Sequence, residues 1–64
     1  MRVTDCGINR IFRYEGQRWL CTHCVHEPPE VRAVPIKNGT WDDEAEVTFT
    51  EEMLFNAWLQ GGDL

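Results

Sequence analysis

The sequence predicts one domain, residues 1–64, of the α+β class. We expect a small antiparallel sheet of three to four strands followed by a C-terminal helix, with a structural zinc as a candidate source of added stability. Three observations carry this prediction. Residues 8–14 and 17–21 are β-prone segments that flank a turn, and residues 45–49 alternate between apolar and polar side chains. Residues 51–60 carry a broad apolar stripe at helical spacing.

The first two strands are predicted to form a hairpin through a turn at Glu15-Gly16. The register that we expect contains four pairs: Tyr14 with Gln17, Arg13 with Arg18, Phe12 with Trp19, and Ile11 with Leu20. The apolar pairs are favourable, whereas the two arginines repel each other unless Glu15 or a bound anion lies between them. A bulge at Gly16 would shift this register by one residue.

The middle of the chain is expected to supply the remaining strands. Residues 31–36 are a strand candidate that Pro35 confines to an edge, because proline lacks a backbone donor. Asn38-Gly39 is typical of a tight turn. Residues 41–44 are expected to form a loop or a short acidic helical turn before the alternating strand at 45–49.

A helix is predicted over residues 51–60, with Thr50 as its N-cap and Gly61-Gly62 as its end. Glu51 and Glu52 suit the positive end of the helix dipole. The apolar surface is wider than a normal stripe and comprises Met53, Leu54, Phe55, Ala57, Trp58 and Leu59. Such a helix either packs under the sheet or buries its spare face in a partner.

Charge is divided unevenly along the chain, whose net charge is −5. Residues 1–37 carry six basic and four acidic side chains, and residues 38–64 carry seven acidic side chains and no basic one. We therefore expect a surface with a basic pole and a strongly acidic pole. At this length only about 60% of the unfolded chain's surface can be buried, so a metal, a disulfide or a partner is expected to add stability.

Cysteine and histidine gather in the run Cys21-Thr22-His23-Cys24-Val25-His26, and the hairpin register brings Cys6 back beside it. Zinc prefers four sulfur and nitrogen ligands, two of them often spaced C-x-x-C. The structural zinc site that we expect comprises Cys6, Cys21, Cys24 and His26, with His23 as the less favoured alternative to His26. Two other interpretations stay open: a disulfide from Cys6 to Cys21 or Cys24, and cysteines that are simply small buried residues.

Catalysis is not expected, because no Gly-rich phosphate loop, Ser-centred elbow or H-E-x-x-H pattern is present. The basic residue near the N-terminus is followed by no apolar stretch, which argues against a signal peptide, and the longest apolar run, residues 53–55, is too short to span a membrane. The odd number of cysteines also fits a cytoplasmic protein better than a secreted disulfide scaffold.

The acidic half of the chain predicts a surface that binds a protein. The candidate partner-binding residues are Trp41, Asp42, Asp43, Glu44, Glu46, Glu51 and Glu52. Presented on one face, these acids would imitate the phosphates of a nucleic acid and attract a protein that grips nucleic acid with lysine and arginine. The tryptophan beside them would supply the buried anchor of such a contact.

In its size, acidic balance and lack of catalytic motifs, the chain resembles phage-encoded anti-CRISPR and anti-restriction proteins. This resemblance implies an inhibitor in the cytoplasm of a bacterial host, whose target is a nucleic-acid-binding protein of a defence complex. It implies no direct contact with nucleic acid and no membrane.

Two alternatives belong to other functional classes. Residues 19–24 resemble the opening W-x-C-x-x-C of small RNA-binding zinc fingers, although the rest of that family's pattern is absent. A zinc-ribbon-like nucleic-acid-binding module would use Arg10, Arg13 and Arg18 interleaved with Phe12 and Trp19. An adaptor subunit of a larger complex would instead dock through the apolar helix at 51–60.

Overall fold

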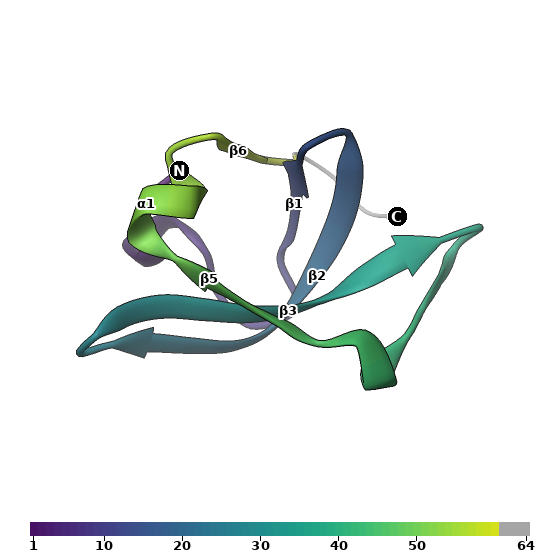
Figure 1. Ribbon diagram of the computed structural model, residues 1–64, viewed down its shortest axis with the longest axis horizontal. Helices are drawn as coiled ribbons and strands as arrows, with labels where there is room; N and C mark the ends of the chain where they lie inside the picture. Colours follow the sequence, from purple (N-terminus) through teal and green to yellow (C-terminus); the bar gives the residue numbers. More distant parts are fainter. Residues whose placement is uncertain (61–64) are drawn as a thin grey trace.

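The protein is mostly β: in the computed structural model, residues 1–60 form a six-strand antiparallel sheet with one short helix (Figure 1). The structure describes residues 1–60. The strands are β1 (Ile11–Tyr14), β2 (Gln17–His26), β3 (Pro29–Lys37), β4 (Thr40–Trp41), β5 (Val47–Thr50) and β6 (Ala57–Leu59). The helical elements are two 3₁₀ turns, η1 (Val3–Asp5) and η2 (Asp43–Ala45), and the α-helix α1 (Glu51–Leu54).

The strands follow the order β4-β3-β2-β1-β6, and β5 pairs with β3 outside this path. The long strand β3 is shared along its length: residues Glu30–Ala33 pair with β5, and residues Ile36 and Lys37 pair with β4. The turn η2 links these two partners and lies at the lower right of Figure 1, whereas α1 follows the other end of β5 at the upper left.

The predicted hairpin is confirmed in all four of its pairs. Its turn residues, Glu15 and Gly16, have φ angles of 50° and 75°, the left-handed geometry of a two-residue hairpin turn. The register shift that we considered at Gly16 does not occur. An irregularity lies further along β2, between Cys21 and His23, where the pairing with β3 moves by one residue.

The prediction that Pro35 confines residues 31–36 to an edge is wrong, because β3 is the most extensively paired strand described. Pro35 lies between the stretches of β3 that pair with β5 and with β4. Its carbonyl accepts a hydrogen bond from the backbone N–H of Asp42 (3.2 Å). The nitrogen and the carbonyl of a strand residue point to the same side, so the Pro35 nitrogen faces the part of β3 that pairs with neither β5 nor β4. The missing donor is therefore tolerated in a central strand.

The predicted helix over 51–60 is wrong beyond its first turn. Thr50 is the N-cap, as expected, and its hydroxyl accepts a hydrogen bond from the backbone N–H of Met53 (3.3 Å). The helix ends at Leu54, and residues Ala57–Leu59 form β6 along the free edge of β1. Strand pairing outweighs the local helical pattern here. The predicted end at Gly61-Gly62 lies outside the described residues.

The main core cluster lies on one face of the sheet and centres on Phe49, which is fully buried, whereas Ile11, Val34 and Ile36 are buried on the other face. The Phe49 ring makes edge-to-face contacts with Phe12, Tyr14 and Trp19 at centroid distances of 5.1, 5.2 and 4.9 Å. The buried residues of this core cluster are Val3, Cys6, Phe12, Cys21, Val31, Ala33, Phe49, Leu54 and Ala57. The core therefore joins η1, five of the strands and α1 into one unit.

No helix within residues 1–60 is long and apolar enough to cross a lipid bilayer.

Candidate functional site

The densest group of charges surrounds η2, and we name it the η2 acidic cluster: Asp42, Asp43, Glu44 and Glu46. All four residues are exposed. Asp42 is the N-cap of η2, where its side chain accepts a hydrogen bond from the backbone N–H of Glu44 (3.0 Å). This cap fixes the path of the backbone, so the carboxylates are displayed by a defined turn.

Glu46 is further held by β2. Its carboxylate accepts a hydrogen bond from the hydroxyl of Thr22 (3.0 Å), and its distance to Nδ1 of His23 is 3.9 Å. The His23 side chain is 58% exposed, so an ion pair with Glu46 is screened by water. Within residues 1–60 this is the only contact of an acidic side chain with a titratable cation. The cluster thus keeps its negative charge uncompensated.

Trp41 borders the cluster, as the sequence predicted. It pairs with Ile36 across β3 and β4 and is 50% exposed. The Asn38-Gly39 turn before it has φ angles of 53° and 79°, which confirms the predicted tight turn. A half-exposed tryptophan on a hairpin offers a rigid apolar surface beside the charges.

Glu51 and Glu52 lie apart from the η2 acidic cluster. They belong to the first turn of α1, at the opposite end of β5 (Figure 1). Four residues of extended chain lie between Glu46 and Glu51, and the five residue steps span roughly 16 Å. The seven predicted partner-binding residues thus form one compact group at η2 and a second, smaller group at α1.

The three cysteines of the predicted zinc site share the core side of the molecule. Cys6 and Cys21 are buried in the core cluster, and Cys24 packs against it. A hydrogen bond to Cys21, aided by burial, raises the pKa of the Cys6 thiol well above its usual range. The same hydrogen bond lowers the pKa of Cys21 while burial opposes it, and burial raises the pKa of Cys24. All three thiols are free in the structure, with no disulfide between them.

The histidines do not join the cysteines. His26 is exposed at the end of β2, opposite Pro29, and His23 faces Glu46. Across residues 1–60, no three histidine, cysteine or acidic side chains form a group that could hold a metal ion. The C-x-x-C run lies within a long strand rather than in the turn that zinc sites commonly use.

Zinc binding by the purified chain stays a prediction that native mass spectrometry can check. That sequence-based prediction requires one bound zinc that is lost with Cys24→Ser, whereas residues 1–60 hold no group of side chains arranged to bind it. A metal-free mass from a fully folded sample would contradict it, and would leave the cysteines as small buried residues.

The aromatic residues of the alternative nucleic-acid module face the core. Phe12 is fully buried, and Trp19 packs against the core cluster with its indole nitrogen buried and without a hydrogen-bond partner in the described structure. Arg10 and Arg13 are exposed, and Arg18 is half-buried. Strand alternation places Arg13 and Arg18 on the face opposite Phe12 and Trp19. The predicted interleaved surface is therefore split between two faces.

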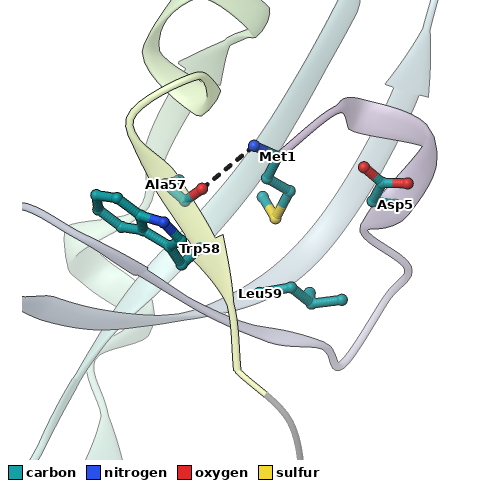
Figure 2. A pocket seen from close by; sticks show the side chains of 5 residues that line it. All are labelled: Met1, Asp5, Ala57, Trp58 and Leu59. Atoms are coloured by element: carbon teal, nitrogen blue, oxygen red, sulfur yellow. Dashed lines mark hydrogen bonds between the residues drawn. The ribbon is translucent and has the colours of Figure 1, made fainter.

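An exposed apolar group follows α1, within the segment where the sequence analysis expected a helix with a spare apolar face. Phe55 and Trp58 are 75% and 68% exposed, and Leu59 is also exposed. A shallow hollow of about 340 Å³ is lined by Met1, Asp5, Ala57, Trp58 and Leu59. Figure 2 shows how these five residues lie around it. The amino group of Met1 donates hydrogen bonds to the carbonyl oxygens of Leu54 (2.9 Å) and Ala57 (3.2 Å). The excess of apolar residues over a helical stripe was the signal available in the sequence.

The sequence matches no family model, and neither a curated protein nor a solved structure matches it significantly.

Proposed function

We propose that the protein is a small acidic inhibitor that imitates nucleic acid and blocks a nucleic-acid-binding protein of a bacterial defence complex, in the manner of phage anti-CRISPR proteins. It acts in the cytoplasm of the bacterial host, by binding and without catalysis. The observation that carries this proposal is the η2 acidic cluster, in which four exposed carboxylates lie within five consecutive residues.

Electrostatic attraction supports the proposal. A protein that binds nucleic acid presents lysine and arginine side chains to phosphates, and it gains affinity when these charges are neutralised. The η2 acidic cluster offers the same negative charge on a turn that the Asp42 cap and the Thr22 hydrogen bond hold in place. A preorganised charged surface loses less entropy on binding than a flexible acidic tail does.

The spacing of the acids also supports the proposal. Phosphates of one DNA strand succeed each other every 3.4 Å or so along the helix axis, so the roughly 16 Å between the acids at η2 and those at α1 spans about five phosphates. Glu51 and Glu52 would extend the charged track that begins at η2. Trp41 would enter a pocket of the target and fix the register of the contact.

The test is affinity capture from a nuclease-treated bacterial lysate, with the wild-type chain beside a neutralised variant. The variant carries Asp43→Asn, Glu44→Gln and Glu46→Gln and keeps Asp42, because Asp42 caps η2. We expect the wild type to retain a nucleic-acid-handling protein and the variant to lose most of it, by roughly tenfold or more, with the wild-type contact weakening as salt is raised.

The matched control neutralises three acids elsewhere on the molecule: Glu15→Gln, Glu27→Gln and Glu30→Gln. It changes the net charge by the same amount, so a general charge effect would weaken both variants alike. Capture of the same protein by the wild type and both variants would remove the η2 acidic cluster from the binding surface and leave the exposed apolar residues after α1 as the docking surface, as in the adaptor alternative.

A further inference from the structure

The strand register aligns five residues across the sheet into one row: Trp41, Ile36, Arg18, Arg13 and Trp58. Directly paired residues of neighbouring strands point to the same face, so the row lies on the face opposite the core cluster. We propose that one end of this row, formed by Arg13, Arg18 and Trp58, binds a nucleotide. The two guanidinium groups hold its phosphate, and the indole of Trp58 stacks on its base.

The two arginines are close neighbours on their strands. The backbone N–H of Cys21 donates to the carbonyl of Arg10 (2.8 Å), so the carbonyl of Arg10 points toward β2 at the start of the β1–β2 ladder. Hydrogen-bonded and non-hydrogen-bonded pairs alternate along an antiparallel ladder. Arg13 and Arg18, three pairs further on, are therefore a non-hydrogen-bonded pair, with a Cα separation of about 4.5 Å and closely approaching side chains.

No carboxylate neutralises this pair within the described residues. The salt bridge found in residues 1–60 joins His23 to Glu46 on β2 and η2, away from Arg13 and Arg18. Glu15 is in the adjoining turn, yet it makes no ion pair with either arginine. Like charges placed directly opposite each other destabilise a sheet. An anion between the two guanidinium groups would reverse that repulsion, and phosphate suits them because arginine binds it through two parallel hydrogen bonds.

Trp58 makes the anion site selective for a nucleotide. It pairs with Arg13 across β1 and β6, one strand spacing of about 4.8 Å from the charged pair. Its side chain is 68% exposed, and Figure 2 shows the indole ring on the side of β6 away from Met1 and Leu59. An exposed ring beside cationic groups is the arrangement by which proteins stack a base while holding its phosphate.

This site is independent of the proposed inhibitor function, because it uses other residues and the opposite charge. Arg13, Arg18 and Trp58 belong to β1, β2 and β6, whereas the η2 acidic cluster follows β4. The two proposals can therefore fail separately. The nucleotide could be free or could belong to a single-stranded oligonucleotide, since both present a phosphate next to a base.

The experiment is an NMR titration of the ¹⁵N-labelled full chain with four probes: inorganic phosphate, adenosine, adenosine monophosphate and a short oligothymidylate. We expect the monophosphate to shift the backbone signals of Arg13 and Arg18 and the indole signal of Trp58. We also expect it to bind about tenfold more tightly than phosphate or adenosine alone. Tighter binding of the oligothymidylate would identify single-stranded nucleic acid as the source, and equal binding would identify a free nucleotide.

Two pairs of variants make the result specific. Arg13→Gln with Arg18→Gln should weaken binding about tenfold or more, whereas Arg10→Gln with Arg32→Gln, which removes the same charge, should leave it nearly unchanged. Trp58→Leu should remove the advantage of the monophosphate over phosphate, and Phe55→Leu should keep it. Removing the two opposed arginines relieves repulsion, so we expect this variant to stay folded, as its own NMR spectrum will show. Equal effects of the two arginine pairs, or no shift with any probe, would overturn the proposal.

Discussion

The core cluster and the η2 acidic cluster lie at the two extremes of this small molecule. The core cluster joins nine buried side chains from η1, five strands and α1, with the ring of Phe49 at its centre. No residue of η2 is buried. The acids there contact other elements through the hydrogen bond from Thr22 to Glu46, the approach of His23 to Glu46 and the backbone hydrogen bond from Asp42 to Pro35. The fold and the charged surface thus depend on different residues.

Because the two clusters share no residue, binding and stability should respond separately to mutation. Burial of apolar side chains supplies most of the folding free energy of a domain this small. Exposed carboxylates contribute little to it, and mutual repulsion makes some of them unfavourable. The proposed inhibitor function assigns the exposed charges of the η2 acidic cluster to a contact with another molecule, and stability measurements alone would not reveal that contact.

The largest loss of stability is expected when the side chain at the centre of the core cluster is removed. Phe49→Ala should cost about 3–5 kcal/mol of unfolding free energy, because it deletes a fully buried ring and its three aromatic contacts. Urea denaturation followed by tryptophan fluorescence measures this loss. The control is Phe55→Ala, whose ring is 75% exposed and whose loss should cost little. Similar costs for both variants would mean that Phe49 does not organise the core.

The hairpin turn that positions the core aromatics gives the next largest effect. Gly16 has a φ of +75°, so Gly16→Ala should cost about 1–2 kcal/mol although the added Cβ would meet open space. Gly7→Ala is the matched change, since that position has no positive φ and its Cβ would lie 3.9 Å from a flexible arginine side chain. Denaturant midpoints of the two variants should differ, and equal midpoints would refute the turn geometry.

A smaller effect is expected at the boundary between β5 and α1. Thr50→Ala removes the N-cap hydrogen bond to the backbone of Met53 and should cost about 1 kcal/mol. Thr50→Ser keeps a capping hydroxyl and should restore most of that loss. If serine fails to rescue the thermal midpoint, the threonine contributes through its methyl group and not as a cap.

The smallest effect should come from the η2 acidic cluster itself. Neutralising Asp43, Glu44 and Glu46 together should change the unfolding free energy by about 0.5 kcal/mol or less, since all three are exposed surface acids. The free energy is read from urea denaturation at low and moderate salt. A loss comparable with that of Thr50→Ala would show that the acids also support the fold, and the separation of the two clusters would no longer hold.

The sequence was most informative where local rules act alone. The β1–β2 register followed from alternation and a two-residue turn, and the Asn38-Gly39 turn and the Thr50 cap followed from backbone preferences. Two predictions failed because the deciding contacts are distant in sequence. Residues 57–59 form a strand and not a helix because they pair with β1. Pro35 fits in a central strand because β3 changes partner from β5 to β4 at that position, so no backbone donor is needed there.

The candidate site was predictable in its chemistry but not in its shape. The exposure of the acids follows from their charge, and Trp41 directly precedes them in the sequence. The separation of Glu51 from the η2 acidic cluster depends on the path of β5, which no local pattern specifies. The C-x-x-C run indicated a zinc turn because its spacing is typical of one, whereas here the pairing of β2 with β3 keeps that run within a strand.

If the protein imitates nucleic acid, it should compete with nucleic acid for binding to the captured target protein. The target is loaded with a labelled nucleic acid, and its displacement is followed by fluorescence anisotropy as the wild-type chain is added. Displacement by the wild type and by the Glu15, Glu27 and Glu30 control, but not by the variant neutralised at Asp43, Glu44 and Glu46, is the result that a nucleic-acid mimic predicts. Equal displacement by all three chains, or binding that leaves the nucleic acid in place, would contradict it.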